Sequence, residues 1–222
     1  MGLRTKWAAG WQAAFLLVLV SAGAASAAGC HQSQPSGVAL VAGTGRTYFH
    51  GDADLCPGHQ PYCLKRAYVI AKDRVVTSVS QDGYTCVFVP SKTTTTIGWI
   101  ETNRLLREPV MSSPPSSAWE GVWKSEGVMT ISVGDGKYGL QASGVDDWNT
   151  YLYGDDGKND LPARNHHAEF SGRVVAVNNH ARLKDAACGV DLILLDEFLI
   201  VEDGTSCGDG NTSFRGIYRR KL

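Results

Sequence analysis

The sequence lacks the marks of a helical protein. No window of the 222-residue chain repeats its apolar residues every 3.6 positions over three turns, so we expect few helices. Beyond the first 27 residues no apolar run is long enough to cross a bilayer as a helix, so we expect no membrane span there. The net charge of −1 gives no reason to expect nucleic acid as a partner.

Signatures of catalysis and of cofactor binding are absent as well. The chain has no Gly-x-Ser-x-Gly elbow and no glycine-rich phosphate loop. Cys56, His59 and Cys63 have the spacing of a partial zinc site, but in an oxidising compartment such cysteines favour a disulfide. The Asp-rich segment 155–160 lacks the alternating acids and the distal Glu of a calcium loop. We therefore expect a protein that is not an enzyme and holds no metal or other cofactor.

The first 27 residues have the layout of a secretory signal peptide. Arg4 and Lys6 supply a positive start, residues 13–20 form an apolar run, and small residues follow up to Ala27. The apolar run is far shorter than the roughly 18 residues that span a bilayer. We therefore predict a periplasmic or secreted protein that is cleaved near Ala27. A lipid anchor on Cys30 is the less favoured alternative, because the apolar run ends too early to lie next to it.

All six cysteines lie at or beyond position 30, and an even number in an exported chain favours disulfides. Two of them fall in the second half, which predicts a bridge between Cys188 and Cys207. The other four allow three pairings and are Cys30, Cys56, Cys63 and Cys86. The Pro- and Gly-containing segment between Cys56 and Cys63 can turn the chain back, so this pair is favoured. Pairing of Cys63 with Cys86 is the main alternative.

The chain divides at residues 109–118, which are rich in Pro and Ser and have the composition of a stiff linker. The charge changes sign across this linker. Residues 28–118 carry 8 basic and 6 acidic side chains, whereas residues 119–222 carry 11 basic and 16 acidic side chains, a net of −5. We therefore predict two domains, residues 28–108 and residues 119–222.

Both predicted domains have the pattern of β-strands. Short runs rich in β-branched and aromatic residues, such as 84–89 and 190–195, are separated by Gly, Asp, Asn and Pro. The segment Gly134-Asp135-Gly136 lies between two such runs and is a strong hairpin signal. We therefore predict an all-β chain, with an antiparallel β-barrel or sandwich in the second domain.

Residues 38–106 resemble the bacterial SH3-like domain of exported proteins. The resemblance rests on the segments 68–73, 84–88 and 98–105, the last of which opens with a Gly-Trp pair. It implies that the first domain is a small SH3-like barrel. Several domains of this family bind cell-wall peptides or anchor wall-active enzymes, and others support a neighbouring domain.

The second domain resembles, more weakly, small periplasmic β-barrels of the lysozyme-inhibitor and lipocalin-like kind. The resemblance rests on the Trp-x-Gly-x-Trp segment 119–123 and on residues 207–218. The loop by which such inhibitors act is not found, and residues 136–138 match it only in part. Inhibition is therefore an analogy from the fold.

Aromatic side chains are the candidate binding residues, because they offer a large area and a polar edge. In the first domain they are Tyr48, Tyr84 and Trp99, of which Trp99 fits the core equally well. In the second domain Tyr151 and Tyr153 alternate along one strand and share a face.

These observations favour an exported binding protein of the cell envelope whose SH3-like domain engages cell-wall peptide, peptidoglycan or an envelope protein. The alternative is a periplasmic inhibitor or immunity protein against a lysozyme-like wall hydrolase, because an acidic second domain would attract a basic enzyme. A hydrolase is the third possibility, although the spacing of Asp146, Asp147 and Glu169 does not single them out as a catalytic pair.

Overall fold

The computed structural model describes residues 29–221 with gaps. The gaps are residues 54, 59, 92–93, 126–129, 138, 154–158, 185–187, 205–206 and 208–212. For residues 130, 146–153 and 159–167 only the backbone is described. The predicted signal peptide therefore lies outside the described residues.

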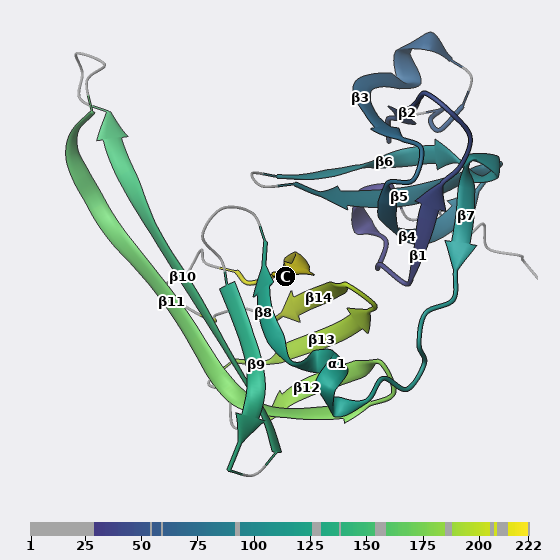
Figure 1. The fold of residues 1–222 in the computed structure, drawn as a ribbon. Helices are drawn as coiled ribbons and strands as arrows, with labels where there is room; N and C mark the ends of the chain where they lie inside the picture. The colour runs from purple at the N-terminus through teal and green to yellow at the C-terminus, as the bar shows by residue number, and fades with distance from the viewer. Residues whose placement is uncertain are drawn as a thin grey trace, which may run out of the picture.

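The described chain is almost entirely β-structure and forms two units, which confirms the predicted all-β class (Figure 1). The first unit is a seven-stranded antiparallel sheet with the order β3-β2-β6-β5-β4-β1-β7. Its strands are β1 (Gly37–Val41), β2 (Arg46–His50), β3 (Leu64–Ile70), β4 (Arg74–Gln81), β5 (Tyr84–Pro90), β6 (Thr95–Glu101) and β7 (Leu105–Glu108). Short 3-10 helices are η1 (Cys30–Gln32), η2 (Pro61–Cys63) and η3 (Thr102–Arg104). Strands β3 and β7 are the two edges of this sheet.

The second unit is a closed barrel of eight strands, preceded by the short helix α1 (Ser116–Trp119). Each strand pairs with the next along the chain, and the last pairs with the first, so the barrel is an antiparallel meander. The strands are β8 (Gly121–Lys124), β9 (Thr130–Gly136), β10 (Gly139–Tyr153), β11 (Asn159–Val177), β12 (His180–Lys184), β13 (Val190–Leu195), β14 (Phe198–Asp203) and β15 (Gly216–Arg220). The structure therefore has a barrel where the sequence left barrel and sandwich open.

Strands β10 and β11 extend well beyond the rest of the barrel (Figure 1). β10 pairs with β9 only over residues 139–145, and β11 pairs with β12 only over residues 173–177. Beyond these points the two strands pair with each other alone as far as Tyr153 and Asn159. The result is a two-stranded ribbon that projects away from the barrel wall.

Three apolar clusters hold the molecule together. One fills the barrel and includes Trp119, Trp123 and Tyr218. A second lies on one face of the first sheet and includes Phe49 and Ile100. The third is shared by both units, because it joins side chains of the opposite sheet face to side chains on the outside of the barrel.

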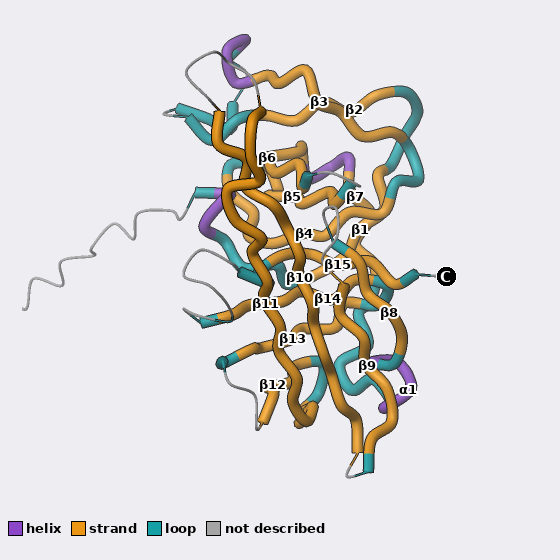
Figure 2. Tube along the Cα trace, turned by 90° about the vertical axis from the view of Figure 1, so that its left-hand side faces the viewer, coloured by secondary structure: helices purple, strands orange, loops and turns teal. Residues whose placement is uncertain are grey.

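The shared cluster follows from the alternation of side chains along the barrel strands. In β14, Leu199 points into the barrel, whereas Phe198 and Ile200 point outward and are buried against the sheet. Val76 and Phe88 meet them from the sheet side. The two units therefore pack through an apolar interface, and Figure 2 shows the sheet directly above β13–β15.

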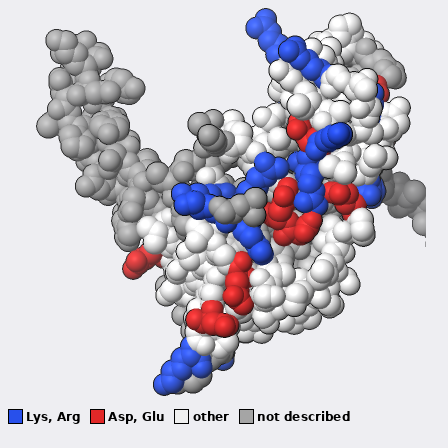
Figure 3. Space-filling view, in the orientation of Figure 1, with Lys and Arg blue, Asp and Glu red and all other residues white. Residues whose placement is uncertain are grey.

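An ion-pair network borders the interface. Arg74 of β4 donates from Nε to Glu108 at 2.8 Å, and its other nitrogens reach Asp196 and Glu197 in the turn between β13 and β14. Glu197 also pairs with Arg219 of β15 at 3.6 Å. Figure 3 shows acidic and basic side chains side by side where the sheet meets the barrel.

Candidate binding face on strands β2 and β3

Strand β2 alternates strictly between buried and exposed side chains. Thr47 and Phe49 are buried, while Arg46 and Tyr48 are exposed. This is the period of two expected for a strand that covers a core with one face only. Arg46, Tyr48 and His50 therefore share the outward face of the sheet.

Strand β3 continues that face at the edge of the sheet. It pairs with β2 so that Tyr68 lies opposite Tyr48 and Leu64 lies opposite His50. Leu64, Tyr68 and Ile70 are each about half exposed, at 52%, 44% and 50%. Arg66, between Leu64 and Tyr68 on the same face, is exposed as well. We call the side chains of Arg46, Tyr48, His50, Leu64, Arg66, Tyr68 and Ile70 the β2–β3 face.

Exposed apolar side chains concentrate in this part of the molecule. Of the thirteen exposed large apolar residues in the described chain, six lie between positions 48 and 70. They are Tyr48, Leu55, Tyr62, Leu64, Tyr68 and Ile70. Single exposed apolar residues are ordinary on protein surfaces, but a group of them marks an interaction site.

Two tyrosines and an arginine form the centre of the face. The rings of Tyr48 and Tyr68 meet edge to face with centroids 5.8 Å apart, and the Arg46 guanidinium lies 4.3 Å from the centroid of the Tyr68 ring. A hydrogen bond with Tyr48 raises the pKa of Arg46 further above its ordinary value. The guanidinium thus lies over an aromatic ring at an exposed position, and guanidinium groups bind carboxylates well.

A hollow of about 320 Å³ adjoins Tyr48. Its lining residues are Arg46, Thr47, Tyr48, His50, Leu64, Glu101 and Arg104. Arg104 is fixed there, because it donates to the Thr47 hydroxyl at 3.0 Å. Figure 3 shows Lys and Arg side chains projecting over β3 at the top of the molecule.

The loop between β2 and β3 adds two exposed apolar side chains. It is closed by the disulfide Cys56–Cys63 and is tied to β2 by a contact of 3.0 Å between His50 Nδ1 and the Gly58 carbonyl oxygen. Leu55 and Tyr62 project from it with 81% and 61% of their surfaces exposed. The loop therefore holds apolar groups in solvent at the end of the β2–β3 face.

The predicted binding residues fall in different places. Tyr48 lies on the β2–β3 face, whereas Tyr84 and Trp99 are buried and belong to the shared cluster. Tyr84 packs against His50 with ring centroids 4.9 Å apart, and burial raises the pKa of its hydroxyl, with Glu101 adding to the effect. Trp99 occupies the core, which was one of its two expected places. The side chains of Tyr151 and Tyr153 lie outside the described residues.

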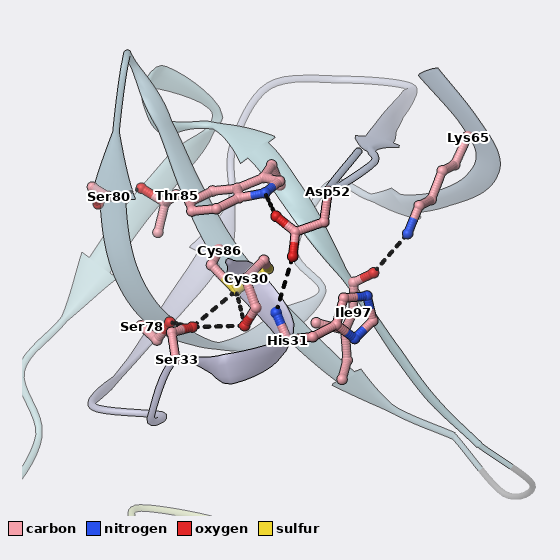
Figure 4. The surroundings of a disulfide bond; sticks show 11 residues. Cys30, His31, Ser33, Asp52, Lys65, Ser78, Ser80, Thr85, Cys86 and Ile97 are labelled. Atoms are coloured by element: carbon pink, nitrogen blue, oxygen red, sulfur yellow. Dashed lines mark hydrogen bonds between the residues drawn. A yellow bond between two sulfur atoms is a disulfide. The ribbon is translucent and has the colours of Figure 1, made fainter. Parts of the chain in front are cut away.

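Trp99 anchors the N-terminal segment through Asp52 (Figure 4). Its indole N–H donates to Asp52 Oδ1 at 2.9 Å, and the His31 backbone N–H donates to Asp52 Oδ2 at 3.3 Å. Burial alone would raise the pKa of Asp52, but the hydrogen bonds from Trp99, Cys30 and His31 outweigh it and lower the pKa. The carboxylate is thus held in its charged form by donors from two parts of the chain.

The structure settles the disulfide pairing. Cys56–Cys63 and Cys188–Cys207 are bonded as predicted, and Cys30 is bonded to Cys86 across 56 positions. Pairing of Cys63 with Cys86 is therefore wrong. The sulfur of Cys30 is buried and bonded to Cys86, so it is not available for a thioether bond to a lipid. Three disulfides fit an extracellular or periplasmic protein.

Sequence reasoning missed most of the β2–β3 face. It selected Tyr48 but not Arg46, Leu64, Tyr68 or Ile70. The alternation along β3 was a signal for this face. The more exposed positions are Leu64, Arg66, Tyr68 and Ile70, and the less exposed positions between them are Lys65, Ala67 and Val69. An alternation in which three of the four outward residues are apolar indicates a surface that contacts a partner.

No helix among the described residues is long and apolar enough to cross a membrane, and no three of their His, Cys, Asp or Glu side chains form a group that could hold a metal ion. Glu169 is exposed, and the side chains of Asp146 and Asp147 lie outside the described residues. Comparison of the chain with protein-family models, curated proteins and solved structures gives no match.

Proposed function

We propose that this chain is a non-enzymatic binding protein. More specifically, it is an exported protein of the cell envelope whose SH3-like unit engages cell-wall peptide, peptidoglycan or an envelope protein through the β2–β3 face. The observation that carries the proposal is the concentration of exposed tyrosines, aliphatic side chains and arginines on this face. Three disulfides and the signal-peptide pattern support a place outside the cytoplasm.

Co-sedimentation with purified peptidoglycan sacculi tests the proposal. The whole processed chain is used, because separated halves would expose the apolar interface between the units. We expect the wild-type protein to sediment with sacculi. The double variant Tyr48→Ala, Tyr68→Ala should bind at least about tenfold more weakly, since aromatic anchors typically contribute more than 1 kcal/mol each.

The matched control is Val177→Ala, which removes an exposed apolar side chain from the barrel surface. It should leave sedimentation unchanged. Absence of wild-type protein from the pellet, together with failure to capture any envelope protein, would remove the proposal.

The projecting ribbon favours a second candidate, an inhibitor or immunity protein against a wall hydrolase. A two-stranded ribbon that leaves a barrel wall has the shape of an element that enters an enzyme cleft, and the second domain carries a net charge of −5. Activity of lysozyme-like hydrolases is measured with and without excess protein. The comparison variant has residues 147–167 replaced by Asn-Gly, a two-residue hairpin turn. Inhibition that survives this replacement, or no inhibition at all, argues against the ribbon as an inhibitory element.

A further inference from the structure

Strand β3 has an open edge. The sheet order places β2 on one side of β3 and no other described strand on its opposite side. An edge of this kind presents unpaired backbone N–H and C=O groups to solvent. The N–H and C=O of Ile70 are already bonded to Asp73, at 2.9 Å and 3.1 Å, so the open part of β3 lies before Ile70. This part is long enough to pair with a further strand, and it contains no proline.

The opposite edge of the same sheet differs from β3. Strand β7 has four residues and is followed directly by Pro109, which has no N–H to donate. It also carries Glu108, which is already paired with Arg74. Of the two edges, β3 is therefore the one suited to strand addition.

From these observations we infer that the β3 edge binds an extended, acidic polypeptide segment as an additional strand of the sheet. The inference rests on the proposed function and narrows its ligand to polypeptide. Backbone groups of the bound segment would pair with those of β3, as in other cases of strand addition. Its side chains on the outward side would then lie beside Leu64, Arg66, Tyr68 and Ile70.

The charge on the face favours acidic side chains. Its arginines are Arg46 and Arg66, both are exposed, and the face carries no acidic side chain. Arg46 is fixed by Tyr48 and Tyr68 with donors to spare. A carboxylate that approaches β3 therefore finds guanidinium groups on the face that also carries Tyr68 and Ile70.

A second copy of the chain is a poorer occupant of the same edge. Pairing of two β3 strands would bring Lys65 and Arg66 of both copies into one short stretch, where like charges repel. Charged residues on an edge strand are a common protection against self-pairing. The same charges leave the edge open to a strand of opposite sign.

The experiment uses the whole disulfide-bonded protein and a fluorescein-labelled octapeptide that alternates Val and Glu. Binding is measured by fluorescence anisotropy. Two twin peptides accompany this probe, one with every backbone nitrogen methylated and one with Gln in place of Glu. We expect the methylated twin to bind at least about tenfold more weakly, because it cannot donate its backbone hydrogen bonds. The Gln twin should also bind several-fold more weakly.

Variants locate the binding edge. Arg66→Gln should weaken binding several-fold, whereas Arg107→Gln, an exposed arginine on β7, should leave it unchanged. Hydrogen exchange of the backbone amides over residues 64–70 should slow when the peptide is bound.

Several results would overturn the inference. Equal binding of the methylated twin would show that backbone pairing is not used, and equal binding of the Gln twin would remove the preference for acids. If the protein sediments with sacculi but does not bind the peptide, the proposed function stands and strand addition is refuted. If it neither sediments with sacculi nor binds the peptide, both the proposed function and strand addition are refuted. A dimer of the free protein with slow exchange over residues 64–70 would show that the edge is occupied by a second copy.

Discussion

Phe198 lies where the barrel meets the sheet, and its replacement by alanine tests whether the two units are held together as described. The residue is the first of β14, and its side chain is fully buried in the cluster shared by both units. The Arg219 guanidinium lies 5.0 Å from the centroid of its ring. Because the ring points away from the barrel interior, its burial depends on the sheet.

The magnitude follows from the lost packing. Phe→Ala in a well-packed core lowers the free energy of unfolding by about 3 to 5 kcal/mol. The lost contact with Arg219 adds about 0.5 to 1 kcal/mol. For a chain of this length each kcal/mol corresponds to roughly 2 to 4 °C in Tm. The total loss of about 3.5 to 6 kcal/mol should therefore lower the Tm of Phe198→Ala by about 7 to 24 °C.

Differential scanning calorimetry measures both the size of the change and the cooperativity. The wild type should unfold in one transition, because neither unit can leave the other without exposing the shared cluster. Phe198→Ala should shift this transition down or split it into two. Val122→Ala on β8 serves as the control, since Val122 is 37% exposed and its loss should change stability by less than about 0.5 kcal/mol. Two separate wild-type transitions, or a loss below 1 kcal/mol in the variant, would refute the packing argument.

Three further predictions concern stability. Arg74→Gln removes the centre of the ion-pair network, and we expect a loss of about 1 to 2 kcal/mol that shrinks as salt is raised in urea unfolding. Asp52→Ala leaves the buried Trp99 N–H without its acceptor and should cost about 1 to 3 kcal/mol at neutral pH. Because the folded pKa of Asp52 is lowered, its contribution is present above pH about 4 and is lost as the pH falls through the folded value, so wild type and variant should converge in acid. Replacement of Cys30 and Cys86 by serine opens a loop of 56 positions and should cost about 4 kcal/mol, against about 2 kcal/mol for the seven-position loop of Cys56–Cys63, both measured by Tm under identical conditions.

Local chemistry made the strands and two of the disulfides predictable. The short β-branched runs and the turn residues between them were sufficient to give the all-β class. Cys56 and Cys63 are close in sequence, and Cys188 and Cys207 were the only cysteines of their half. The Cys30–Cys86 bridge depends on η1 lying against β6 next to β5, a contact between distant segments that local pattern does not specify.

The interface between the units left a signal that sequence reasoning did not use. Residues 192–195 and 198–201 are all apolar. A barrel strand with one face exposed to solvent would instead alternate apolar and polar residues. The structure shows why, because Leu192, Leu194 and Leu199 fill the barrel while Ile193, Leu195 and Phe198 meet the sheet. A continuous apolar run in an antiparallel protein thus indicated a second covering element.

The same interface explains why Tyr84 and Trp99, two of the predicted binding residues, are not on the surface. The outward face of the sheet runs without a break from Val38 and Val76, through Trp99 opposite His50, to Tyr48 opposite Tyr68. The barrel and the segment around Cys30 cover this face over β4, β5 and part of β6, which buries Tyr84 and Trp99. They leave it open over β2 and β3. Among the described residues, the β2–β3 face is therefore the exposed continuation of the surface on which the barrel docks.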